Sequence, residues 1–480
     1  MINLIYNEIY KIFKRRITII FVLFIVLQFL FISLIGKYYL YNLEHEDEIR
    51  IQSINKKYSK DSDNVVKTSG EYIEDMNFKD LYNLNKEYPK KSWQRYILTE
   101  DGTPYINCIN LSKYKNHNEE TLKECETKLD ELVNKVKRIT WQDYIIEKQD
   151  TALENLDKLK SEYDEETDEL EKEDIYRSMQ AVMFEIDGYK YHLDKKIPID
   201  YTDNSVMIDE YVSLAIGHIN IEEDESKYQN YYNLMEKRID EDNMYSYKYR
   251  IENNLDSISQ NSASKIFRDY VCTAIPIVIV YMLLISSSII VDEFNKGTIK
   301  QLLIRPYTRR KILISKLLAC IICTLLFILL YQLVAFIFIG ITYGFKSYSI
   351  PIILYDFNTK NIVKMSIIKY MLINTATFIP EYLMLLLFTI FVGILLTNEA
   401  LAVGIPFVIL IVSSYLPTTN IKILKYFPTV CWNLNEFLWG GLPSLRGLEL
   451  LPSLIVCIVT IIIVFFGCLS SFKNKEINNQ

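Results

Sequence analysis

The ionisable residues that border the apolar stretches are the ones whose type and spacing could support chemistry. Residues 293–318 hold seven Lys or Arg and a single Glu between two apolar runs. Gly297 and Thr298 can end one helix and begin another, and Pro306 ends or kinks the second. We expect a helix of about two turns on the membrane surface, whose cations meet lipid phosphates and whose exposed face docks a partner. The simpler alternative is a loop whose charge only fixes orientation.

A second ionisable residue, Glu381, lies in the apolar sequence FIPEYLMLLL. An ionisable group at membrane depth is costly and usually faces a cavity or a partner, which makes Glu381 a candidate for lining a pathway. The alternative is that Pro380 starts the true membrane span and leaves Glu381 near the outer surface.

Motifs for nucleotide, metal or nucleophile chemistry are absent from the sequence. It contains no G-x-x-x-x-G-K-[ST], no H-E-x-x-H and no G-x-S-x-G. The four histidines have no ligand-like spacing and are expected to be solvated: His45, His117, His192 and His218. We therefore expect no catalytic residues, no cofactor and no metal in this chain.

The charge distribution divides the chain into one acidic block and an apolar, mildly basic remainder. Residues 42–266 carry 31 Lys and Arg against 50 Asp and Glu, a net of −19, and the rest carry 22 against 10, a net of +12. Together these give the overall charge of −7. Such asymmetry predicts a membrane protein with one large aqueous domain.

Six stretches approach the roughly 20 apolar residues that a membrane helix needs: 17–36, 270–291, 313–341, 370–396, 400–416 and 450–471. The fifth is the shortest. Lys and Arg gather at the N-terminus, in the loop 292–312 and in the tail 473–480, so these regions are placed in the cytoplasm. Residues 42–266 and the segment 417–449 then lie outside. Residues 1–16 predict an amphipathic interfacial helix, or alternatively a continuation of the first span (17–41).

The acidic block is predicted to be mainly helical. Apolar residues recur at helical spacing between Pro104 and Pro198, which predicts long paired helices, as in a coiled-coil hairpin. The acidic runs 164–174 and 220–226 are expected to be solvated helix faces, with capture of a cationic substrate as the alternative. A bridge between Cys108 and Cys125 remains open. The fold class is an all-α polytopic membrane protein with six spans and a helical extracellular domain.

The loop resembles the first intracellular loop of ABC-2-type ABC transporter permeases. In that family an acidic residue precedes Gly-Thr, a Leu-rich short helix, a Pro, then Ser/Thr-Arg and a Lys before the next span. The matching residues are Glu293, Gly297, Thr298, Leu302, Leu303, Pro306, Thr308, Arg309 and Lys316. Position also fits, because the loop lies between the second and third predicted spans. The resemblance covers residues 1–41 and 267–480 but not the acidic block.

The resemblance implies the permease subunit of an exporter in the bacterial plasma membrane, with both termini cytoplasmic. A separate ABC ATPase would bind ATP and dock on the loop, with Glu293 and Arg305 contributing to polar positioning. A second permease subunit, identical or similar, would complete the assembly in the lipid, and no nucleic acid is expected. The resemblance also suggests short re-entrant helices in 417–449. Peptides, lipids, drugs and ions remain open as substrates.

Two other classes of function remain as alternatives. The chain could be a membrane-anchored sensor or scaffold whose outer helices bind a ligand or partner without transport. It could also be a secretion-apparatus component or surface receptor, because such proteins can follow one span with a large helical domain.

Overall fold

The chain folds into two compact units, which are described separately. The computed structural model describes residues 1–58, 69–221, 231–272, 276–297, 307–419, 421–443, 445 and 447–475. The membrane unit comprises Met1–Lys37, Gln260–Ile352 and Asp356–Gln480, and the acidic unit comprises Tyr38–Ser259 and Ile353–Tyr355.

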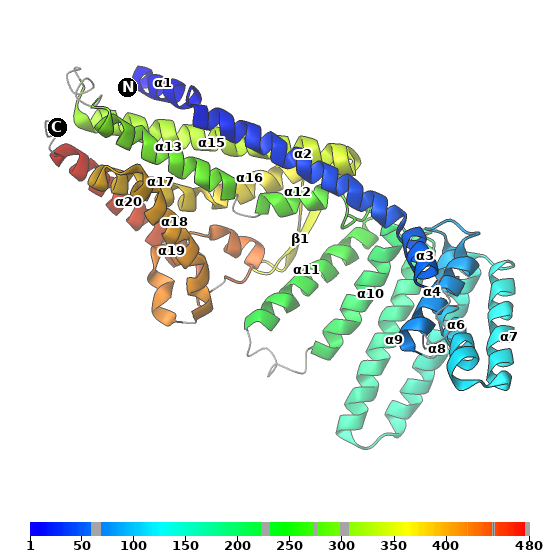
Figure 1. Cartoon of the computed structure of the whole chain (residues 1–480). Coiled ribbons are helices and arrows are strands. Elements are labelled where there is room, and N and C mark those ends of the chain that lie inside the picture. Colours follow the sequence, from blue (N-terminus) through cyan, green and yellow to red (C-terminus); the bar gives the residue numbers. More distant parts are fainter. Residues whose placement is uncertain are drawn as a thin grey trace. The chain divides into compact units, whose positions relative to one another are not determined.

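The membrane unit is built mainly from helices (Figure 1). Its longer elements are α1 (Ile2–Phe13), α2 (Arg16–Glu44, which continues into the acidic unit), α12 (Ala263–Cys272), α13 (Pro276–Asn295), α15 (Arg309–Tyr343), α16 (Ile367–Thr377), α17 (Ile379–Leu396), α18 (Glu399–Tyr415) and α20 (Leu450–Asn474). The sequence prediction of a mainly helical chain is therefore confirmed.

Within the described residues, five helical stretches are long and apolar enough to cross a membrane: α2, α13, α15, the α16–α17 pair and α20. The fifth predicted span, 400–416, corresponds to α18, which has 17 residues. At about 1.5 Å per residue it extends about 26 Å, less than the roughly 30 Å of a bilayer core. The structure thus supports five spans by length and composition, and leaves α18 as a shorter apolar helix.

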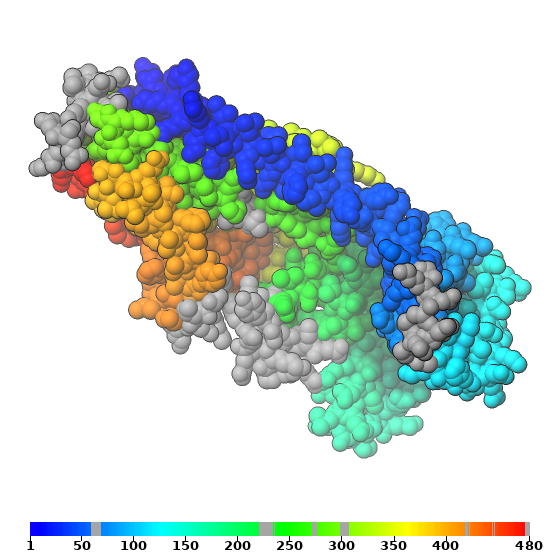
Figure 2. Space-filling view, viewed as in Figure 1, coloured from blue at the N-terminus to red at the C-terminus, as the bar shows by residue number. Residues whose placement is uncertain are grey.

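Burial separates the inner helices of the membrane unit from the peripheral ones. Side chains around the whole circumference of α13 are buried, from Val278 to Glu293. By contrast, α2 lies at the surface of the membrane unit, where Figure 2 shows it in blue. It leaves many apolar side chains uncovered, among them Ile20, Leu27 and Phe31. Aromatic contacts still hold α2 in place, because Phe21 packs on Tyr281 of α13 and on Phe327 of α15.

Between α15 and α20 the chain also forms shorter elements, of which the all-α prediction omitted the two strands. They are η3 (Phe345–Ser349), the two-stranded sheet of β1 (Ile352–Asp356) and β2 (Asn361–Met365), and then η4 (Leu416–Thr419), η5 (Lys422–Tyr426), α19 (Pro428–Cys431) and η6 (Leu434–Gly440). Gly440 has φ of +72°, and a Cβ there would lie 2.7 Å from the Cβ of Phe357, so a larger residue would collide. Short helices thus occur within 417–449, where the resemblance suggests short re-entrant helices; their re-entry into the membrane stays a prediction.

The acidic unit is also mainly helical (Figure 1). Its elements are α3 (Glu46–Lys57), α4 (Gly70–Asn85), α5 (Trp93–Glu100), α6 (Thr103–Leu111), η1 (Ser112–Asn116), α7 (Glu119–Val136), α8 (Trp141–Glu165), α9 (Glu169–Lys195), α10 (Asp203–Ile221) and α11 (Tyr231–Glu252).

Helices α8 and α9 form the long antiparallel hairpin that the apolar spacing predicts. Ala152, Leu156 and Val182 are buried where the two helices meet. In the turn between the two helices, the carboxylate of Glu166 accepts hydrogen bonds from the backbone N–H groups of Thr167 and Asp168. The acidic run 164–174 lies at this tip of the hairpin. Residues 222–226 of the second acidic run lie outside the described residues.

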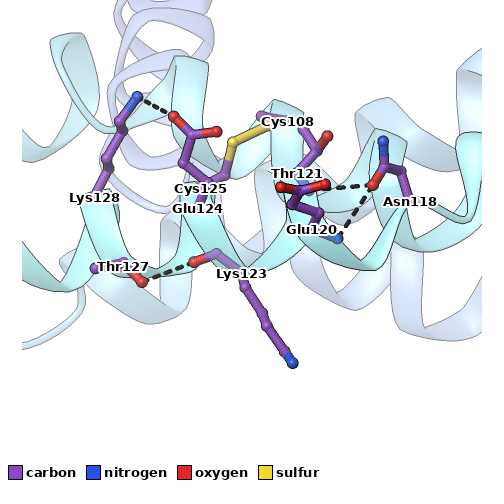
Figure 3. The surroundings of a disulfide bond; sticks show 9 residues. All are labelled: Cys108, Asn118, Glu120, Thr121, Lys123, Glu124, Cys125, Thr127 and Lys128. Atoms are coloured by element: carbon purple, nitrogen blue, oxygen red, sulfur yellow. Dashed lines mark hydrogen bonds and ion pairs between the residues drawn. A yellow bond between two sulfur atoms is a disulfide. The ribbon is translucent and has the colours of Figure 1, made fainter.

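A disulfide between Cys108 and Cys125 joins α6 to α7 (Figure 3). Asn118 caps the N-terminus of α7 by accepting from the backbone N–H groups of Glu120 and Thr121. The bridge that the sequence left open is therefore formed. Five further cysteines are buried and unpaired: Cys320, Cys323, Cys431, Cys457 and Cys468.

Three residues of β1 belong to the acidic unit although the chain reaches them only after α13 and α15. On α11, the hydroxyl of Ser246 donates to the carbonyl oxygen of Ile353 over 3.2 Å. The carboxylate of Asp242 accepts from the backbone N–H of Tyr355, and the ring of Tyr245 stacks on that of Tyr355. The acidic unit is thus discontinuous in sequence.

Candidate functional site

A buried cluster of charges connects three elements of the membrane unit. The Lys316 ammonium lies 2.9 Å from Glu8 Oε2 and 2.7 Å from Glu293 Oε1. Lys316 is 1% exposed. Since a buried charge is tolerated when it is paired and hydrogen-bonded, the two carboxylates are what allow this lysine to be buried.

Each charged side chain reaches the cluster from a different helix. Leu4, Glu8 and Ile12 follow one another at intervals of four on α1 and form its buried face, which packs on α15. Glu293 is in the last turn of α13, and Lys316 is in the third turn of α15. The sequence predicted an amphipathic helix here but did not single out Glu8.

The opposite face of α1 carries exposed apolar side chains, which suits a helix in a membrane interface. They are Ile2, Tyr6, Tyr10 and Phe13. Sequence reasoning missed Glu8 because it stands alone as an acidic residue on α1. Its spacing from Leu4 and Ile12 was the available signal, since a carboxylate in a buried row needs a partner.

A second shell of charges surrounds the cluster. The Lys11 ammonium bridges Glu8 and Glu293 at 2.8 Å and 3.5 Å. Arg15 pairs with Asp292 at 3.2 Å and donates to the hydroxyl of Ser288. These contacts tie the junction between α1 and α2 to the end of α13.

The charges of this cluster shift the pKa values of Glu8 and Lys11, which lie outside the spans. Burial opposes ionisation of Glu8, but Lys316 and Lys11 outweigh it and hold the pKa of Glu8 below its ordinary value. Burial likewise opposes the charge on Lys11, and Glu8 and Glu293 outweigh it and raise the pKa of Lys11. Both groups are therefore charged near neutral pH.

The structure places only some of the predicted coupling residues. Glu293, expected to face a partner, is 8% exposed and paired with Lys316. Gly297 has φ of +66° in the turn that follows α13. Thr298, Leu302, Leu303, Arg305 and Pro306 lie outside the described residues.

The residues after the loop have structural roles at the start of α15. The hydroxyl of Thr308 caps the helix by accepting from Lys311 N. Arg309 donates to the carbonyl oxygens of Lys473 and Lys475 at 2.9 Å and 3.2 Å. Arg309 therefore joins the start of α15 to the end of α20 and lies apart from the cluster of Lys316.

Glu381 occupies the first turn of α17, directly after Pro380. The helix does begin here, as the alternative interpretation supposed, because α16 ends at Thr377 and Phe378 separates the two. The residue is nevertheless only 4% exposed, and its side chain lines a cavity of about 540 Å³. Glu381 is thus buried beside a cavity, and its position at membrane depth stays a prediction.

The histidines show one departure from the sequence prediction. His192 was expected to be solvated, but it is 1% exposed and its Nδ1 lies 2.9 Å from the carbonyl oxygen of Ile197. The short connection after α9 folds back over the ring and covers it. Among the described residues, no three His, Cys, Asp or Glu side chains gather as a metal site would require.

Comparison with known proteins identifies a family for the chain. Residues 231–478 match the family model described as "Protein of unknown function (DUF2705)". The chain belongs to this family. The match includes Glu293, Lys316 and Glu381, whereas Glu8 precedes it.

Two relatives from Bacillus subtilis (strain 168) are similar to parts of the chain. The "Uncharacterized protein YhcI" is 26% identical over 239 residues, which cover 48% of this chain and 74% of the relative. The "Uncharacterized membrane protein YdbK" is 31% identical over 149 residues, which cover 30% of this chain and 52% of the relative. No solved structure matches.

Proposed function

We propose that the chain is the permease subunit of an ATP-binding cassette exporter in the bacterial plasma membrane. A separate ABC ATPase would bind and hydrolyse ATP, because the sequence has no P-loop of its own. The cytoplasmic loop 292–312 would receive the ATPase, and the spans would move the substrate. A second permease subunit would complete the assembly.

The observation that carries this proposal is the cluster around Lys316. Its members Glu293 and Lys316 lie on either side of the loop, one at the end of α13 and the other near the start of α15. Glu8 links both to α1. A displacement of the loop would therefore reach three helices at once through short, buried ion pairs, as force transmission from a docked ATPase requires.

The loop sequence supplies the docking chemistry. Leu302 and Leu303 would place apolar side chains in a groove of the ATPase, and Arg305 would provide polar positioning. Because Glu293 is already paired inside the protein, its role in this scheme is to anchor the loop rather than to touch the partner.

The Cys108–Cys125 bridge supports the placement of the acidic block outside the cell. Disulfides persist in oxidising compartments and are rare in the cytosol. The uncovered apolar side chains of α2 suit contact with lipid or with the second permease subunit.

A decisive experiment compares the Leu302→Asp chain with the parent. Affinity-tagged chains are purified from native membranes, and the captured proteins are identified by mass spectrometry. An aspartate buried in the ATPase groove is unpaired and costs several kcal/mol, which lowers affinity by roughly a thousandfold. The parent should capture an ABC ATPase, and the variant should lose it.

Leu170→Asp provides the matched control, because Leu170 is 76% exposed on α9. It introduces the same charge on a solvated surface and should retain the ATPase and its hydrolysis rate. Capture of no ABC ATPase by the parent, or equal capture by the Leu302→Asp chain, would rule out docking at the loop.

A groove in the acidic unit favours a second candidate, a ligand-binding sensor. It has a volume of about 460 Å³ and is lined in part by Tyr96, Tyr144, Tyr189, His192 and Asp209. Burial, together with nearby carboxylates such as Asp209, raises the pKa of Tyr189, so its hydroxyl stays protonated and can donate. A sensor would bind its ligand here without capturing an ATPase, which the same purification distinguishes.

A further inference from the structure

The cavity beside Glu381 has the shape and the walls of a ligand site. It lies within the membrane unit where the first turns of α13 and α17 meet the end of α18, α19 and η6. Its volume of about 540 Å³ falls in the range of roughly 300–1,000 Å³ that is usual for small-molecule sites. Phe378, Phe407 and Trp432 give it aromatic walls.

The polar groups of this cavity are incompletely satisfied. Among the described residues, no hydrogen bond or ion pair reaches the carboxylate of Glu381, although the residue is 4% exposed. Thr429 and Asn433 also line the cavity, and Thr429 Oγ1 and Asn433 Oδ1 are buried without a hydrogen-bond partner in the protein. Buried polar atoms are normally paired, so these three oxygen-bearing groups point to a bound molecule that donates hydrogen bonds.

The charge of the lining defines the chemistry of that molecule. A second carboxylate, Glu436, lines the cavity and accepts from Asn433 Nδ2 over 2.8 Å. The lining residues include two glutamates and neither lysine nor arginine. An anion would be repelled, and a neutral molecule would leave the Glu381 carboxylate without a counter-charge.

We infer that this cavity binds an organic cation, a protonated amine that carries an apolar, preferably aromatic, body. The ammonium would donate to Glu381 and to the free oxygens of Thr429 and Asn433. The body would pack against Phe378, Phe407 and Trp432, whose ring faces also attract cations. A bare metal ion fits poorly, since most of this volume and its aromatic walls would remain unused.

Binding at this cavity requires no ATPase and is measured on the full-length chain alone, purified in detergent. The probe is dansylcadaverine, a fluorescent primary amine with a naphthalene ring, and its neutral N-acetyl derivative serves as the matched ligand control. The parent should bind the amine saturably and the neutral derivative at least tenfold more weakly.

Glu381→Gln removes the charge while keeping the size of the side chain. We expect it to weaken binding of the amine by roughly tenfold to a hundredfold and to leave the neutral derivative unaffected. Glu399→Gln removes an exposed carboxylate at the start of α18 and should bind as the parent does. Circular dichroism and gel filtration verify that both variants are folded.

Energy transfer from tryptophan to the dansyl group locates the bound probe. Trp432→Phe removes a tryptophan that lines the cavity and, compared at saturating probe, should lower the sensitised emission. Trp141→Phe removes a tryptophan that does not line the cavity and should lower the emission less. Absence of saturable binding, equal affinity of the Glu381→Gln and parent chains, or equal affinity for the amine and its neutral derivative would each overturn the inference.

Discussion

Glu8 and Glu381 are buried to the same degree in the membrane unit, each with 4% of the residue exposed, but their surroundings are opposite. Glu8 meets two ammonium groups, Lys316 at 2.9 Å and Lys11 at 2.8 Å. Glu381 borders a cavity and meets no partner among the described residues. Burial alone therefore does not separate a structural carboxylate from one that is available to a ligand.

The difference lies in what each carboxylate contributes to the folded state. Around Lys316 the desolvation cost of burying three charges is offset by the short contacts between them. If one charge is removed, the others stay buried without that compensation. At Glu381 burial imposes a desolvation cost that no contact with a described residue of the protein offsets. We expect substitutions in the first region to affect stability, and substitutions in the second to affect binding.

The largest effect should come from Lys316→Met, which leaves Glu8 and Glu293 buried without their shared cation. We expect a loss of about 3–5 kcal/mol in the free energy of unfolding, measured by SDS titration in mixed micelles. Lys311→Met removes an exposed lysine from the same helix and should change little. Adding Glu8→Gln and Glu293→Gln to Lys316→Met should restore much of the loss; equal stability of the two methionine variants would contradict a structural cluster.

Glu8→Gln should have an intermediate effect that depends on pH. Because the pKa of Glu8 lies below its ordinary value of 4.5, its charge stabilises the folded state above that pH, and this stability is lost as pH falls through the lowered pKa. The variant should lose about 1–3 kcal/mol at pH 7 and show a flatter profile down to pH 3. Glu154→Gln, at an exposed position of α8, is the control, and a profile for Glu8→Gln as steep as that of the parent would speak against the assignment.

The smallest effect on stability should come from Glu381→Gln, because no protein contact is lost. We expect the free energy of unfolding to change by less than about 1 kcal/mol, or to rise, since a buried unpaired charge is removed. The same SDS titration measures it. A loss as large as that of Lys316→Met would mean that Glu381 has a structural partner and would erase the contrast between the two regions.

Much of the membrane unit could be predicted because long apolar runs specify helices almost independently of their neighbours. The limits of α15 and α20 fall within a few residues of the predicted spans. The prediction was less accurate where tertiary contacts determine the secondary structure. The segment that forms β1 and β2 is too short for a clear period.

The candidate sites were likewise predictable only in part. Glu293 and Lys316 stand out in the sequence because they flank a distinctive loop. Glu8, however, precedes Lys316 by 308 residues. No local pattern encodes that pairing. Glu381 could be singled out from its apolar neighbours, whereas Thr429 and Asn433 reach the same cavity only through the folding of 417–449.

The contribution of β1 to the acidic unit has a consequence for the order of events during synthesis. Contacts between residues close in sequence form early, while distant ones wait until both segments exist. The hairpin of α8 and α9 can assemble as soon as the ribosome has delivered it. The side chains of Asp242, Tyr245 and Ser246 must wait for Ile353 and Tyr355, which follow α13 and α15 in the chain. Insertion of those two helices is thus a step in the maturation of the acidic unit, and an insertion defect should also leave that unit incompletely packed.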